Sequence, residues 1–138
     1  MDDSTWNRLL DAARAARENA HAPYSRFAVG AAVLDEQGRV FAGANAENAA
    51  YPQGWCAETA ALAAMVSAGG RRVQAAVVVG VAEQPVTPCG GCRQRLREFA
   101  GDDIPLWAAD LQQVRARFTL GELLPASFGP QHLPPSTP

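Results

Sequence analysis

The chain has 138 residues, of which 48% are hydrophobic, so we expect a single domain with a substantial buried core. Its formal net charge is −2, which argues against nucleic acid or anionic membranes as partners, because both favour basic patches. The acidic start, Met1-Asp2-Asp3-Ser4, does not resemble a secretory signal, and no window approaches the roughly 20 apolar residues of a membrane helix. With no export signal, the three cysteines predict reduced thiols in the cytoplasm.

The N-terminal part predicts a helix followed by a β-hairpin. In residues 4–20 apolar side chains recur at three- and four-residue steps, which is typical of a helix that packs on a sheet, and Ser4 is the expected N-cap. Residues 27–34 form a nearly continuous apolar run, which predicts a strand covered on both faces. The turn over 35–38 then leads to a second strand over 39–45.

Helices and apolar strands alternate in the rest of the chain, which predicts an α/β layered fold with some parallel strands. The expected elements are a helix over 56–68, a strand over 73–81, a helix over 90–100, strands over 105–109 and 114–118, and a helical turn over 119–124. From Gly129 the sequence is rich in Pro and Ser. We therefore expect one domain over 1–128 and a flexible tail over 129–138.

The cysteines lie in two short motifs that each open a predicted helix, Cys56-Ala57-Glu58 and Pro88-Cys89-Gly90-Gly91-Cys92. The intervening helix and strand can bring both helix starts to the same end of the sheet. Structural zinc sites normally have four protein ligands, whereas catalytic zinc sites have three and keep water in the fourth position. Three cysteines therefore favour a catalytic zinc, with Glu58 as the general acid and base.

Other interpretations of the cysteines are weaker. A Cys-x-x-Cys pair also occurs in redox proteins, zinc ribbons and iron–sulfur proteins. A redox pair is expected just after the first strand, whereas this pair comes late in the chain, and zinc ribbons and iron–sulfur clusters usually need a fourth ligand. A zinc-stabilised binding module without turnover stays open as an alternative, although such a module would not need Glu58.

With these motifs, the sequence resembles the zinc-dependent cytidine deaminases of the small homotetrameric type. The likeness continues in residues 22–32, 45–49, 92–94 and 123–128, so it spans nearly the whole chain. It implies a three-layer α/β/α fold with a mixed five-stranded sheet and helices on both faces. It also implies one Zn²⁺ per subunit, held by Cys56, Cys89 and Cys92 with water as the fourth ligand.

The resemblance also implies roles for the residues around the metal. Glu58 would move protons from the water to N3 of cytosine and to the departing ammonia. The implied substrate contacts are Asn45 and Glu47 to the ribose 3′-hydroxyl, Phe27 against the base, the Ala57 N–H to the base O2, and the Thr87 carbonyl to the exocyclic amine. Tyr51 and Phe128 would reach the site of a neighbouring subunit, so that a homotetramer shares its active sites.

The implied reaction converts cytidine and 2′-deoxycytidine to uridine and 2′-deoxyuridine plus ammonia, in cytoplasmic pyrimidine salvage. The alternative is deamination of another aminated ring, such as blasticidin S or a modified cytidine. Asn45 and Glu47 favour a nucleoside, because a site built to pair a hydroxyl rejects a substrate that lacks it. A loop that grips a free 3′-hydroxyl also argues against a polynucleotide substrate.

Two positions depart from the family pattern. Thr59 stands where members commonly have Arg directly after the catalytic Glu, and Ala44 stands where they often have Cys. Three thiolates on Zn²⁺ leave a net negative charge, which raises the pKa of a bound water. We expect this charge to be offset by Arg93, next to Cys92, or by the dipoles of the two helices.

Overall fold

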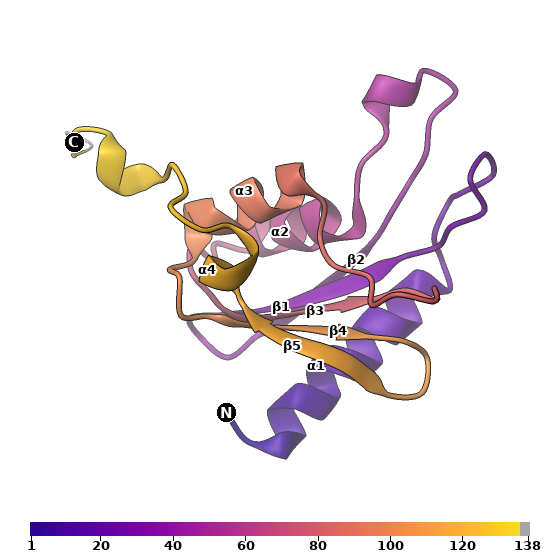
Figure 1. The fold of residues 1–138 in the computed structure, drawn as a ribbon, viewed down its shortest axis with the longest axis horizontal. Coiled ribbons are helices and arrows are strands. Elements are labelled where there is room, and N and C mark those ends of the chain that lie inside the picture. Colours follow the sequence, from indigo (N-terminus) through magenta and orange to yellow (C-terminus); the bar gives the residue numbers. More distant parts are fainter. Residues whose placement is uncertain (136–138) are drawn as a thin grey trace.

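The computed structural model describes residues 1–135, and within them a five-stranded sheet lies between two helical layers (Figure 1). The elements in chain order are α1 Asp3–Arg17, β1 Gly30–Asp35, β2 Val40–Ala44, a 3₁₀ helix Tyr51–Gln53, α2 Ala57–Ser67, β3 Val73–Val79, α3 Gly90–Phe99, β4 Pro105–Ala109, β5 Val114–Thr119, α4 Leu120–Leu123 and a 3₁₀ helix Pro130–His132. This order confirms the predicted α/β fold. None of these helices combines the length and the apolar character that crossing a membrane requires.

The strand order of the sheet is β2-β1-β3-β4-β5. β3 and β4 are parallel, and the other neighbouring pairs are antiparallel, so the sheet is mixed as predicted. Gly30, the first residue of β1, pairs with both Ala44 at the end of β2 and Val79 at the end of β3. The segments before β1, after β2 and after β3 therefore all emerge at one end of the sheet.

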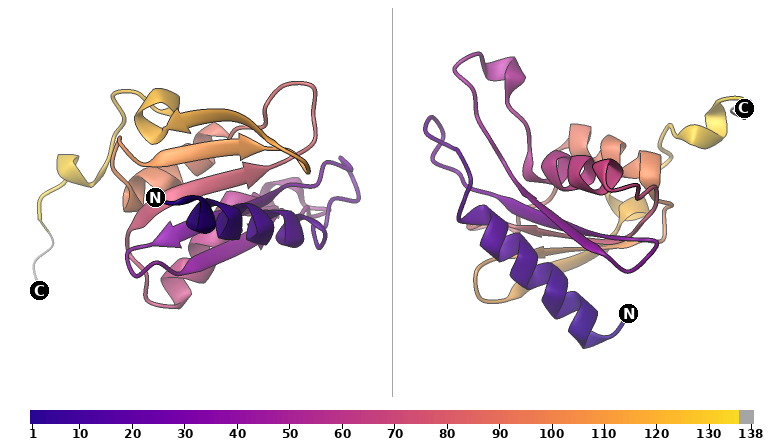
Figure 2. Two further views of the ribbon diagram at one scale, coloured as in Figure 1. Left: turned by 90° about the horizontal axis from the view of Figure 1, so that it is seen from below. Right: turned by 180° about the vertical axis from the view of Figure 1, so that it is seen from behind.

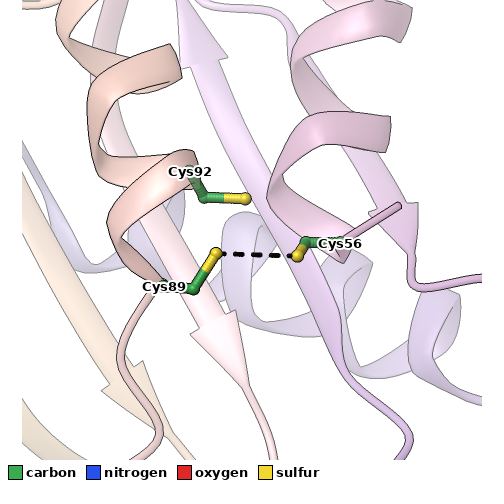
Figure 3. Close-up of side chains that lie close together, drawn as sticks. All are labelled: Cys56, Cys89 and Cys92. Atoms are coloured by element: carbon green, nitrogen blue, oxygen red, sulfur yellow. Dashed lines mark hydrogen bonds between the residues drawn. The ribbon is translucent and has the colours of Figure 1, made fainter. Parts of the chain in front are cut away.

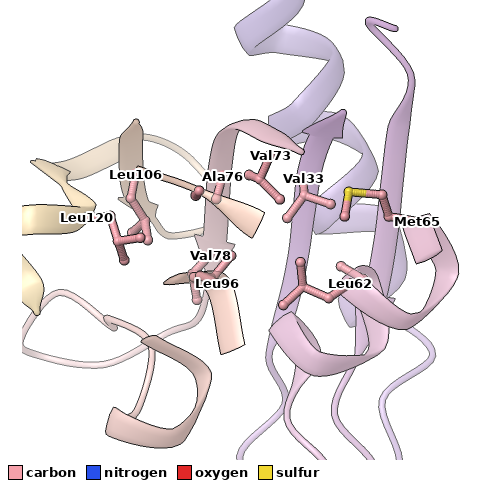
Figure 4. Close-up of a cluster of buried hydrophobic side chains, with 11 residues drawn as sticks. Val33, Leu62, Met65, Val73, Ala76, Val78, Leu96, Leu106 and Leu120 are labelled. Carbon is pink, nitrogen blue, oxygen red and sulfur yellow. The ribbon is translucent and has the colours of Figure 1, made fainter. Parts of the chain in front are cut away.

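Different helices cover the two faces of the sheet (Figure 2). α1 packs on one face, where Trp6 stacks on Trp107 with their ring centroids 3.6 Å apart, and α2 and α3 pack on the other. Strand residues alternate between the two layers, and the cluster beneath α2 and α3 includes Val33, Leu62, Met65, Ala76, Val78, Leu96 and Leu106 (Figure 4). Helices on both faces explain why every residue of β1 is buried.

Close packing of α2 on β2 fixes where the first metal motif begins. A Cβ at Gly43 would lie 2.5 Å from the Cβ of Ala60, so only a residue without a side chain lets this alanine-rich helix approach so closely. Cys56, at the N-cap of α2, is thereby held above the end of β2.

The structure corrects several predicted boundaries. α1 begins at Asp3 because Asp2, not Ser4, is the N-cap, and the carboxylate of Asp2 accepts the Thr5 N–H at 2.9 Å. β1 begins at Gly30 rather than residue 27, because the Val29 N–H and the Phe27 carbonyl bond to the side chain of Asn45 instead of to a strand. The tail predicted over 129–138 includes the 3₁₀ helix Pro130–His132, its flexibility stays a prediction, and residues 136–138 lie outside the described residues.

Candidate active site and metal centre

The three cysteine sulfurs meet between the N-terminal ends of α2 and α3 (Figure 3). Cys56 and Cys89 are the N-caps of these helices, and Cys92 lies in the first turn of α3. All three Sγ atoms lie within 4.8 Å of one another, and those of Cys56 and Cys89 are 3.7 Å apart. Sulfurs that bind one tetrahedral zinc at about 2.3 Å lie about 3.8 Å apart, so the three thiols fit a Zn²⁺ ion and leave its fourth position open.

The thiols have unequal electrostatic surroundings. Burial, followed by the charge of Cys92, raises the pKa of Cys56 to about 12. Burial and the charge of Glu58 likewise raise the pKa of Cys92, whereas for Cys89 the Cys92 N–H and the Cys56 side chain outweigh burial and lower the pKa. Because zinc binds thiolates, loading the site releases protons. The positive ends of two helix dipoles face these sulfurs and favour the charged form.

A cavity of about 410 Å³ opens beside the sulfurs at this end of the sheet. Most of the predicted site residues line it, namely Phe27, Asn45, Glu47, Cys56, Ala57, Glu58, Thr87 and Cys89. Cys92 lies beneath the cavity and is fully buried. The sheet register thus brings together residues that are up to 62 positions apart, from Phe27 to Cys89.

Glu58 is the buried carboxyl group of the cavity. It lies in the first turn of α2, and only 6% of its surface is exposed. Burial raises the pKa of Glu58 above its ordinary value. A carboxyl group that holds a proton closer to neutral pH is suited to giving and taking a proton beside a metal.

Asn45 and Glu47 are held in place by hydrogen bonds to the segment before β1. Asn45 Oδ1 accepts the Val29 N–H at 2.9 Å, and Asn45 Nδ2 donates to the Phe27 carbonyl at 2.9 Å. Glu47 accepts the Tyr24 and Ser25 N–H groups on Oε1 and the Ser25 hydroxyl on Oε2. An amide nitrogen carries two protons and a carboxylate oxygen two lone pairs. One N–H of Asn45 and one lone pair of Glu47 Oε2 therefore stay available to a ligand.

Tyr51 and Phe128 do not line the cavity. Tyr51 is 76% exposed on the 3₁₀ helix before α2, where its ring meets the edge of Tyr24. Phe128 is 57% exposed in the C-terminal segment and stacks on His132. Both rings therefore face outward on this chain, and their role in a neighbouring subunit's site stays a prediction.

The cavity includes residues that we did not predict. Ser25 orients Glu47, and Trp55 lines the wall with its backbone paired to Ala46 by bonds of 2.9 and 3.0 Å. This pairing ties the loop that carries Asn45 and Glu47 to the residue before Cys56. An apolar aromatic directly beside a metal-ligand motif was the available signal for Trp55. Val86, which packs against Gly80, had no signal in the sequence.

Arg93 supports the loop before α3. Its guanidinium donates to the Pro88 carbonyl at 2.7 Å, the Leu123 carbonyl at 2.7 Å and the Thr87 hydroxyl at 3.0 Å. In the described hydrogen bonds its guanidinium thus binds oxygen acceptors, not the sulfurs whose charge we expected it to offset. The bonds hold Thr87 and the start of α3 against α4, so Arg93 acts on the site through this loop.

Comparison with known proteins agrees with this site. Residues 3–107 match the family model described as the cytidine and deoxycytidylate deaminase zinc-binding region. The cytidine deaminase of Sporosarcina psychrophila is 41% identical over 126 residues, which cover 91% of this chain and 93% of the relative. The cytidine deaminase of Mycobacterium tuberculosis is 44% identical over 134 residues, which cover 97% of each.

Solved structures show the same likeness. The crystal structure of cytidine deaminase from Burkholderia pseudomallei superimposes with a TM-score of 0.83 at 42% identity, covering 93% of this chain and all of that one. The fold and the three-thiol centre define a zinc-dependent deaminase. The chain belongs to the cytidine deaminase family.

Proposed function

We propose that the chain catalyses the hydrolytic deamination of cytidine and 2′-deoxycytidine to uridine and 2′-deoxyuridine, with release of ammonia, in pyrimidine salvage. The observation that carries this proposal is the cavity itself. Glu58 and two of the three clustered thiols line this cavity together with Asn45 and Glu47, which supports the proposal. The cytidine deaminases at 41% and 44% identity support the choice of substrate.

The reaction adds water at C4 of the base and expels the amine. Cys56, Cys89 and Cys92 would hold the zinc ion, which when bound would lower the pKa of a water molecule toward neutrality and so supply the nucleophile. Glu58 accepts one proton from the water and delivers it to N3 while the oxygen bonds to C4. It then takes the second proton from the new C4 hydroxyl and passes it to the amine, so that the C4–N bond breaks, ammonia leaves and the C4 carbonyl forms. Its raised pKa fits a group that must take and return a proton in one cycle.

Recognition of the nucleoside uses the free hydrogen-bonding capacity of the cavity wall. The remaining N–H of Asn45 and the remaining lone pair of Glu47 match the 3′-hydroxyl, which both accepts and donates. Phe27, 39% exposed in the cavity, offers a ring to the base. The Ala57 N–H, one of the unpaired donors at the start of α2, reaches the base O2, and the Thr87 carbonyl accepts from the exocyclic amine.

Self-association as a homotetramer completes this proposal. The cavity is open to solvent. Four exposed aromatic side chains lie in or near it, namely Tyr24, Phe27, Tyr51 and Trp55. Phe128 is a further exposed aromatic residue in the C-terminal segment. A neighbouring copy that covered these rings would bury apolar surface and close the cavity to water. Sedimentation of the zinc-loaded protein should therefore give four chains per particle, and a monomer with full activity would exclude shared sites. The thiolate ligands favour a reducing cytoplasm.

The direct test is turnover with metal analysis on the same sample. Purified protein is mixed with cytidine, ammonia release is followed, and zinc per chain is measured. We expect one zinc per chain together with deamination of cytidine and 2′-deoxycytidine. Zinc without turnover on any aminopyrimidine nucleoside would contradict the proposal. Turnover of blasticidin S alone would favour the other aminated rings.

A further inference from the structure

Thr59 makes a direct contact with the metal centre. Its hydroxyl Oγ1 lies 3.4 Å from Cys92 Sγ, and this contact joins the start of α2 to the first turn of α3. Within residues 1–135, this is the only hydrogen bond that the Thr59 hydroxyl makes. The hydroxyl therefore has the sulfur as its acceptor, even though Thr59 marks a departure from the family pattern.

The direction of this bond follows from the chemistry of the ligand. A cysteine that binds zinc is a thiolate and carries no proton, so the Thr59 hydroxyl has to donate. Cys92 is also the ligand that most needs a donor. Cys89 is exposed and Cys56 partly exposed, so water can solvate their charge, whereas Cys92 is fully buried. A buried charge without a hydrogen-bond donor is costly.

The guanidinium of Arg93, next to Cys92 in the sequence, is directed to oxygen acceptors. The three guanidinium nitrogens of Arg93 bind the Pro88 and Leu123 carbonyls and the Thr87 hydroxyl. Among the described side chains outside the cysteines, Thr59 is thus the one with a hydrogen bond to a ligand sulfur.

We propose that Thr59 is a positioning residue of the metal centre, whose hydroxyl donates to the Cys92 thiolate, fixes its orientation and withdraws negative charge from the sulfur. This proposal rests on the zinc site of the proposed function. Three thiolates exceed the charge of Zn²⁺ by one, and a donor to sulfur reduces the charge that the metal receives. Residues that orient metal ligands in this way change metal affinity by about 10–100-fold.

The test compares Thr59→Val, which keeps the shape of the side chain and deletes the hydroxyl, with Thr59→Ser, which keeps the hydroxyl. Zinc affinity is measured by competition with a chromophoric chelator. The sulfur-to-metal charge-transfer band is recorded after cobalt substitution. We expect Thr59→Val to bind zinc about tenfold more weakly and its band to move to longer wavelength, because the sulfur electrons are no longer stabilised by a donor. Thr59→Ser should stay within about twofold of the wild type.

Circular dichroism checks the fold of each variant, and Thr59→Ala, which also lacks the hydroxyl, replaces Thr59→Val if that variant does not fold. Unchanged zinc affinity and an unchanged band in a folded variant without the hydroxyl would overturn the proposal. Both readouts are independent of turnover. An inactive wild type would therefore contradict the proposed function, while the role of Thr59 would still be decided by the zinc affinity and the charge-transfer band.

Discussion

Cys56, Cys89 and Cys92 are held by the first turns of two regular helices, whereas Asn45 and Glu47 follow the end of a strand and are held by hydrogen bonds to residues 24–29. The metal centre depends on short motifs and on helix packing. The part of the cavity formed by Asn45 and Glu47 depends instead on contacts between irregular segments. We therefore expect changes at the metal centre to abolish the chemistry and changes in the wall to weaken binding in graded steps.

The carboxyl groups of the two regions illustrate the same contrast. Burial raises the pKa of Glu58. Hydrogen bonds from the Ser25 hydroxyl and the Ser25 N–H lower the pKa of Glu47. Glu58 is thus prepared to exchange a proton, and Glu47 stays an ionised acceptor.

The largest effect should come from Cys89→Ser, because a serine hydroxyl stays protonated at neutral pH and is a poor zinc ligand. We expect zinc per chain to fall from one to near zero and turnover to disappear. Circular dichroism should change little, because Cys89 is exposed and lies outside the hydrophobic clusters. A variant that kept both stoichiometric zinc and turnover would show that Cys89 is not a ligand.

Glu58→Gln should remove the proton transfer and leave the metal in place. Loss of a general acid and base costs about 10²–10⁴-fold in rate. We therefore expect kcat to fall by this factor while zinc per chain, measured on the same preparation, stays at one. Retention of wild-type kcat would instead favour a zinc-stabilised module or a different catalytic base.

Asn45→Ala removes the proposed donor to the ribose hydroxyl and two bonds to the segment before β1. Loss of such bonds costs about 1–3 kcal/mol, which corresponds to about 5–150-fold in kcat/KM. Asn48→Ala is the matched control, since Asn48 lies in the same loop but does not line the main cavity. Equal losses of kcat/KM in both variants would indicate a general effect on the loop.

Ser25→Ala should have the smallest effect, because it removes one of three bonds to Glu47. The pKa of Glu47 in the folded protein lies below the ordinary value of 4.5. The carboxylate is therefore ionised and accepts all three hydrogen bonds above pH 4.5. These bonds are lost as the pH falls through the depressed pKa of the folded protein. Deleting the Ser25 donor raises this pKa. The acid-side rise in KM should then begin at a higher pH than in the wild type, with a fewfold change at neutral pH. If the dependence of KM on pH is the same in Ser25→Ala and in the wild type, Ser25 has no role in substrate binding.

The metal centre is fixed by short local motifs and the Asn45 and Glu47 loop by distant contacts, and this difference explains which features the sequence predicts. Apolar strands such as β1 and β3 are evident from composition, because burial on both faces leaves no polar alternation. The metal ligands follow from the spacing of cysteines at helix starts. The structure confirms that these three thiols meet.

The remaining features depend on contacts between distant segments. Ser25 matters only because it reaches Glu47, and Thr59 only because α3 brings Cys92 beside it. The apolar run also predicts too early a start for β1, since the side chain of Asn45 bonds to the Val29 N–H and the Phe27 carbonyl before the strand begins. A single sequence contains no local signal for such bonds.

The most direct test of the account compares cytidine with 3′-deoxycytidine on the wild type and on Glu47→Gln. The central claim is that one cavity joins the metal centre to a wall that recognises the ribose hydroxyl. A site whose polar groups are left unpaired rejects the analogue, so the wild type should prefer cytidine in kcat/KM by about a hundredfold or more. In Glu47→Gln this preference should collapse toward one. Equal kcat/KM for the two nucleosides on the wild type, or an unchanged preference in the variant, would contradict the claim.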